Sequence, residues 1–79
     1  MEETKIYKRE EIANELVEKT ILEVVDALKS RGYDPIDQIV GYLMSGDPGY
    51  ISSYQDARKK ITAIERTKIL EVLVKSYIE

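Results

Sequence analysis

A block from Gly32 to Tyr50, GYDPIDQIVGYLMSGDPGY, constrains the fold more than any other part of the chain. It contains an Asp-Pro pair twice, at 34–35 and 47–48, and Asp at the N-cap followed by Pro at the first helical position is a strong helix start. Gly46 predicts the end of the helix that the first pair begins. Gly41 interrupts that helix at a cost of about 1 kcal/mol relative to Ala, which indicates a close contact with its backbone. One apolar stripe at helical spacing runs along it: Ile36, Ile39, Val40, Leu43 and Met44.

Helical periodicity continues on both sides of this block. From about Lys8 to Ser30 a stripe recurs every four residues and predicts an amphipathic helix: Ile12, Leu16, Thr20, Val24 and Leu28. Ala13, Val17 and Ile21 widen this stripe. After the block, we expect a third helix capped by Ser52 or Ser53 and a last helix capped by Thr67. The sequence leaves open whether these two helices are separate or one bent rod. With no strand pattern and no linker, the chain is predicted to be all-α, a small bundle of four or five short helices.

Size and composition predict a small domain that associates with itself. Residues 1–7 carry no helical period, so we expect a mobile N-terminal tail ahead of a single helical domain at residues 8–79. A chain of 79 residues buries only about 60% of the surface that its unfolded form exposes. There is no cysteine for a disulfide, and every predicted helix carries an apolar stripe. We therefore expect a homodimer.

Charge and hydropathy limit the partners. The sequence has no secretory signal and no apolar run near the roughly 20 residues that cross a bilayer, which favours a cytoplasmic protein without membrane insertion. Its net charge is -3, with 15 acidic and 12 basic side chains, so no specific nucleic acid is expected as a partner. A small helix-turn-helix nucleic-acid binder, with the third helix as the reader, is the alternative that remains.

The side chains offer little for catalysis. The chain contains neither His nor Cys, the commonest general base near neutral pH and the most nucleophilic side chain. Its glycines lack the following Lys-Ser/Thr of a phosphate-binding loop. Carboxylates such as Asp34 and Asp47 precede Pro and are better interpreted as helix caps than as catalysts. We predict no catalytic residue, no metal site and no cofactor, although an enzyme using carboxylates and tyrosine alone is a third hypothesis.

Two groups of side chains are candidates for a binding surface. Arg58, Lys59 and Lys60 fan over about 200° of a helix and form either a solvated face or a contact for a phosphate or acidic partner. Asp56 is expected to pair with Lys60 four residues later. Four tyrosines lie in or beside the central block and pack in the core or form a protein interface: Tyr33, Tyr42, Tyr50 and Tyr54.

The block, together with Ala57-Arg58, Ile64-Glu65-Arg66 and the Leu-Val-Lys-Ser-Tyr-Ile ending, resembles the IreB regulatory phosphoprotein family of Gram-positive bacteria. The resemblance runs nearly end to end. It implies a non-enzymatic cytoplasmic regulator, phosphorylated on threonine by a membrane Ser/Thr protein kinase with extracellular PASTA repeats. It also implies negative regulation of the cell-envelope stress response and of resistance to cephalosporins and other β-lactams, through an unidentified downstream protein.

The resemblance assigns the phosphorylation to Thr4, within Glu3-Thr4-Lys5-Ile6-Tyr7. The chain lacks the second upstream threonine of some family members and has Lys8-Arg9 where they tend to be acidic, so a single site is expected. A phosphate adds about -1.5 to -2 charge next to Glu2 and Glu3. We hypothesise that Arg58, Lys59 or Lys60 receives it, from the same subunit or its mate, or that an outside partner does.

Overall fold

The structure is a computed structural model that describes the backbone of residues 2–79 and the side chains of residues 10–79. Four α-helices and two single 3-10 turns make up these residues, and no strand occurs among them. The elements are α1 (Glu2–Ser30), α2 (Pro35–Ser45), η1 (Pro48–Tyr50), η2 (Tyr54–Asp56), α3 (Ala57–Thr62) and α4 (Arg66–Ile78). The predicted all-α class is confirmed.

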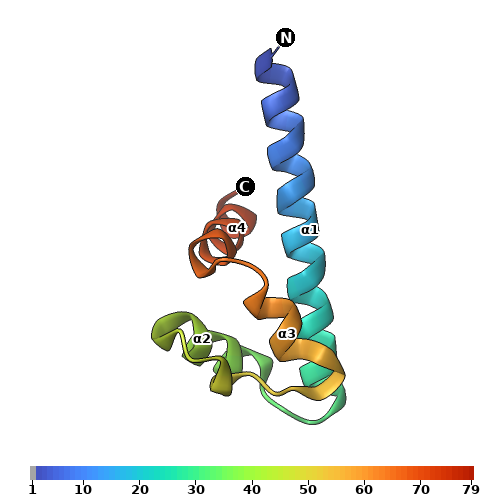
Figure 1. Cartoon of the computed structure of the whole chain (residues 1–79), viewed down its shortest axis with the longest axis vertical. Helices are drawn as coiled ribbons and strands as arrows, with labels where there is room; N and C mark the ends of the chain where they lie inside the picture. The colour runs from blue at the N-terminus through green and yellow to red at the C-terminus, as the bar shows by residue number, and fades with distance from the viewer. Residues whose placement is uncertain (1) are drawn as a thin grey trace.

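Helix α1 is the long axis of the molecule, which measures 46 × 22 × 22 Å (Figure 1). The other helices gather around its C-terminal half, and its N-terminal half extends past them. The helix begins at Glu2, well before the start predicted near Lys8. Residues 2–7 therefore have helical backbone. Whether residues 1–7 move in solution stays a prediction.

The core lies where α1, α2, α3 and α4 meet. Its fully buried large side chains come from three of these helices and from the η1–η2 loop: Val24, Leu28, Ile51, Ile61, Ile69 and Val72. The predicted stripe of α1 is buried at Val17, Ile21, Val24 and Leu28. Ile12 and Leu16 are instead 58% and 60% exposed, because α4 reaches this part of α1 on another face, at Asn14 and Glu18. The turns of α1 before these residues extend past the other helices (Figure 1).

Both Asp-Pro pairs begin helical turns, as the sequence predicts. The Oδ1 atom of Asp34 accepts hydrogen bonds from the backbone N–H groups of Ile36 (3.0 Å) and Asp37 (3.2 Å). Asp47 caps the shorter turn η1 by accepting from the N–H of Gly49 at 2.8 Å. These short-range contacts set the bounds of α2 and turn the chain back toward α1.

The third and last helices are separate. Helix α3 ends at Thr62 and α4 begins at Arg66, so residues 63–65 connect them. The predicted serine cap is found one turn earlier than α3: the Ser52 hydroxyl accepts from the Tyr54 N–H at 3.1 Å at the start of η2, whereas the N-cap of α3 is Asp56. The predicted cap of the last helix is wrong, because Glu65 stands at the N-cap of α4 in place of Thr67.

A glycine follows the end of α1 and another follows the end of α2. The two have similar backbone conformations but different neighbours, so substitutions at the two positions can be compared. Gly32 and Gly46 have φ of +82° and +77°. A Cβ on Gly46 would lie 2.9 Å from the Cζ atom of Arg66, whereas one on Gly32 would meet nothing within 4 Å.

We expect Gly32→Ala to lower the free energy of unfolding by about 1 kcal/mol, the cost of a left-handed alanine. Gly46→Ala should cost more, because it also displaces the guanidinium that donates to the Leu43 carbonyl at 3.0 Å. Urea unfolding of both variants measures the difference. Equal losses would mean that Arg66 moves aside freely.

Candidate functional site

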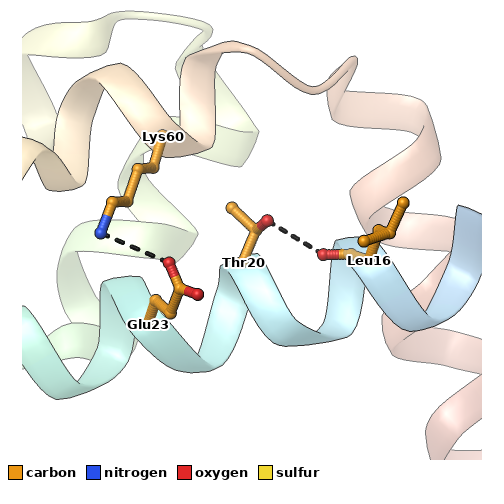
Figure 2. A network of polar contacts seen from close by, with 4 residues as sticks. All are labelled: Leu16, Thr20, Glu23 and Lys60. Atoms are coloured by element: carbon orange, nitrogen blue, oxygen red, sulfur yellow. Dashed lines mark hydrogen bonds and ion pairs between the residues drawn. The ribbon is translucent and has the colours of Figure 1, made fainter.

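The three consecutive basic residues of α3 are engaged to different degrees. The Nε atom of Arg58 donates a hydrogen bond to the Ile51 carbonyl at 2.9 Å. The Nζ atom of Lys60 lies 3.3 Å from the Glu23 carboxylate of α1 (Figure 2). Among residues 10–79, Lys59 has no acidic partner within 4.0 Å. Lys59 and the outer nitrogens of Arg58 are therefore the groups that remain available to an anion.

Lys60 does not form the predicted pair with Asp56. Asp56 has a left-handed backbone, with φ of 61°, at the junction of η2 and α3. The ion pair to Glu23 joins α3 to α1, and its two side chains are 40% and 43% exposed. An ion pair exposed to this extent contributes at most about 1 kcal/mol, so it can exchange partners at little cost.

Arg31 adds a fourth cation at the end of α1. Its guanidinium carbon lies 5.4 Å from the centroid of the Tyr54 ring, within the range of a cation–π contact. Because Tyr54 immediately precedes α3, Arg31 belongs to the same end of the molecule as the α3 cations. We call this group, Arg31, Arg58, Lys59 and Lys60, the basic end. Arg31 was not predicted from the sequence, because its partner ring lies far along the chain.

The four candidate tyrosines have different environments. Tyr42 is 6% exposed and belongs to the core of the single chain. Tyr33 and Tyr50 are 42% and 51% exposed. Tyr54 is half-buried beneath Arg31. An interface role for the three accessible rings stays a prediction, while Tyr42 packs inside the chain.

An apolar groove of about 570 Å³ runs between α1, α2 and α4. Ile21 of α1, Ile39 of α2 and Leu73 of α4 are among its lining residues. Ile36 of α2 also lines the groove and is exposed, and Met44 near the end of α2 is exposed as well. The sequence indicated the apolar stripes of α1, α2 and α4. It did not indicate that the three helices leave a groove where these stripes meet.

A second hollow, between α1 and α4, is polar. Its lining includes Asn14, Glu18 and Ser76, and the Ser76 hydroxyl donates to the Glu18 carboxylate at 3.1 Å. The described residues contain no group of three Asp or Glu side chains placed to hold a metal ion. Within residues 2–79, no helix has both the length and the apolar character needed to cross a membrane.

The comparison with known families decides the identity. A family model described as IreB regulatory phosphoprotein matches residues 2–79. The chain belongs to the IreB regulatory phosphoprotein family. The resemblance that the central block suggested is thereby confirmed over nearly the whole sequence.

In this IreB-family chain, the predicted phosphorylation residue and the basic end are far apart. Thr4 lies in the first turn of α1, and its side chain is outside the described side chains. Lys60 meets the same helix at Glu23. Nineteen residues at 1.5 Å each separate the two positions by about 28 Å along the helix. The structure does not bring Thr4 and the α3 cations of one subunit together.

Proposed function

We propose that the chain is a non-enzymatic cytoplasmic regulator whose Thr4 is phosphorylated by a membrane Ser/Thr kinase with extracellular PASTA repeats. The observation that carries this proposal is the family match over residues 2–79. The local sequence Glu3-Thr4-Lys5 supports the choice of acceptor, because it resembles the phosphorylated segment of the family. The phosphate changes the charge of one end of α1 and thereby the surface that a partner meets.

The proposed outcome is negative regulation of the cell-envelope stress response and of cephalosporin and β-lactam resistance in a Gram-positive bacterium. The regulator acts through a downstream protein. A non-enzymatic role is consistent with a sequence that has neither His nor Cys. It is also consistent with the capping role of Asp34 and Asp47, two of the carboxylates that catalysis would need.

Self-association is part of the proposal. Large apolar side chains remain exposed on α1, α2 and α4, with Leu22 at 63%, Val74 at 54% and Tyr77 at 93%. Leu22 and Leu73 line one hollow between α1 and α4, and apolar surface shared between helices in this way is typical of an interface. Sedimentation equilibrium at micromolar concentration should show a species of twice the 9.1 kDa chain. A species of single-chain mass throughout would contradict a homodimer.

Phosphorylation has a direct test. Incubation with the cognate kinase and ATP should add one phosphate, located on Thr4 by mass spectrometry of the N-terminal peptide. Thr4→Ala should abolish the modification. Thr62→Ala is the matched control and should retain it, since the Thr62 hydroxyl already donates to the Arg58 carbonyl at 2.8 Å. Phosphate on another residue, or none at all, would contradict the assignment.

The helix-turn-helix alternative gains nothing from the described residues. Its reading helix α3 has only six residues. Two of the three cations on that helix already contact Ile51 and Glu23. A steep salt dependence of DNA retention would be needed to revive it.

A further inference from the structure

We infer that a phosphate on Thr4 is received by the basic end of a second copy of the chain, with the two α1 helices antiparallel. The inference rests on the proposed phosphorylation and adds where the phosphate binds and what it does. The binding residues are Lys60 and Lys59 of the second copy. The consequence is a tighter dimer in the phosphorylated state.

Reach disfavours binding of the phosphate within the same subunit. With α1 helical from Glu2, residue 4 lies about 28 Å from the level of Glu23, where Lys60 binds. Unwinding residues 2–7 leaves residue 8 about 22 Å from that level. Four extended residues then span at most about 14 Å, so a return would require this segment, the phosphothreonine and Lys60 all to be fully extended.

The course of α3 brings Lys60 to the stretch of α1 that an approaching helix meets, close to the exposed Lys19 of α1 itself. The chain passes Arg31 at Tyr54, at the end of α1, and then runs back along α1 as α3 (Figure 1). Lys60 reaches α1 at Glu23. Arg58, held by Ile51, lies closer to the turn.

The exposed stripe of α1 runs along the helix to the contact between Glu23 and Lys60. Leu16, Thr20 and Glu23 follow one another at helical spacing, and Thr20 donates to the Leu16 carbonyl at 2.9 Å (Figure 2). Lys60 approaches the same side of α1. Ile12 and Leu16 continue this stripe toward the start of the helix, where they are 58% and 60% exposed. This half of the stripe is free for a second α1.

The register of an antiparallel pair determines which residues of the second copy lie opposite the phosphate. If the two helices cross at Ile12, residue 4 of one copy lies opposite residue 20 of the other. If they cross at Leu16, it lies opposite residue 28. Since α3 packs along this stretch, the first turn of each α1 meets α3 of the other copy.

Charge favours the same orientation. Residues 2–18 contain six acids and three bases, a net charge of -3. A phosphate brings this end to about -5. The basic end of the second copy carries the opposite sign, whereas a parallel pair would place the two acidic ends together. A second copy therefore offers the phosphate both the apolar contact and the complementary charge.

The phosphate competes with Glu23 for Lys60. The existing pair is 3.3 Å long and about two-fifths exposed, so it is a weak competitor for a dianion. Lys59 adds an ammonium group with no acidic partner among residues 10–79. Charge-assisted contacts between these ammonium groups and the phosphate oxygens connect the two copies.

The test uses the full chain with phosphothreonine installed at position 4 by semisynthesis. Its dimer dissociation constant is measured by sedimentation equilibrium beside that of the unmodified chain. We expect the phosphate to lower the constant at least about tenfold at low ionic strength, and less at high ionic strength. No change, or a monomer in both states, overturns the inference. Because no kinase is used, a kinase that ignores Thr4 contradicts only the proposed function.

Variants that replace charged side chains with Gln identify the residue that binds the phosphate. The double variant Glu23→Gln, Lys60→Gln keeps a polar contact between α1 and α3 and should remove most of the phosphate effect. Lys68→Gln, Glu71→Gln is the control, since it removes one cation and one acid on α4; it also frees Lys75, which lies 3.4 Å from Glu71. This control variant should retain the phosphate effect. Glu23→Gln alone frees Lys60 and should enlarge the phosphate effect. A full effect in the first double variant would overturn the assignment.

Cross-linking tests the orientation. The chain contains no cysteine, so single thiols can be introduced without background. Phosphorylated Lys5→Cys chains mixed with Ala63→Cys chains should form a disulfide between copies. Asp47→Cys, beyond α2, is the control and should not. Preferential disulfides between two Lys5→Cys chains would indicate a parallel pair and overturn the proposal.

Discussion

Replacing Leu28 with Ala is expected to lower the free energy of unfolding by about 2–5 kcal/mol. Leu28 is fully buried at the centre of the core, so the variant loses apolar burial and leaves a cavity. The same change at Leu16, three turns earlier on α1, removes a side chain that is 60% exposed. In an isolated subunit it should cost less than about 0.5 kcal/mol. The free energy of unfolding of a domain of this size is at most about 5–15 kcal/mol. Leu28→Ala therefore brings the domain close to unfolding.

Urea unfolding of both variants at several protein concentrations separates core from interface. A dimer is stabilised by mass action, so its midpoint rises with concentration. If Leu16 belongs to the dimer contact, Leu16→Ala should weaken that rise, whereas Leu28→Ala should lower stability at every concentration. Equal small losses in the two variants would contradict the position of the core.

The parts of the fold that the sequence predicted are those that local contacts determine. Asp34 caps amides two and three residues away, and Asp47 does the same for Gly49. Such contacts depend only on the residues beside them, so α2 and η1 were found correctly. The separation of α3 from α4 was not predictable, because it follows from how Ile61 and Ile69 both reach the core.

A stripe of apolar residues does not reveal what covers it. Val24 and Leu28 are buried, yet Ile12 and Leu16 share their stripe and are exposed. The difference lies in where α3 and α4 pack, which no local pattern encodes. The pairing of Lys60 with Glu23 was missed for the same reason, and the local pair with Asp56 was predicted in its place.

The candidate site was also only partly predictable from the sequence. Thr4 came from the resemblance to a family, since a single threonine near the start of a chain has no periodicity or cap to distinguish it. The cations of α3 were recognisable as a run, but the structure was needed to show that Arg58 and Lys60 are engaged. The separation of about 28 Å along α1 between Thr4 and Glu23, where Lys60 binds, follows only once α1 is known to be continuous.

Gly41 is the position where helix propensity and packing conflict most. A Cβ there would collide with the Tyr50 ring, lying 2.8 Å from Cε1 and closer to Cδ1. This is the close approach that the sequence indicated, and η1 supplies it. Gly41→Ala is expected to lose about 1–2 kcal/mol of stability, because the displaced ring costs more than the roughly 1 kcal/mol that Ala gains in a helix.

The sign of this effect should reverse when the ring is absent. In a Tyr50→Ala background, Gly41→Ala meets open space and should gain up to about 1 kcal/mol. The double-mutant cycle therefore gives a coupling of about 2–3 kcal/mol, measured by urea unfolding of the four chains. A coupling near zero would mean that Tyr50, which is 51% exposed, leaves its place without loss. A large coupling would show that the glycine is required by the return of η1 across α2, and not by the helix itself.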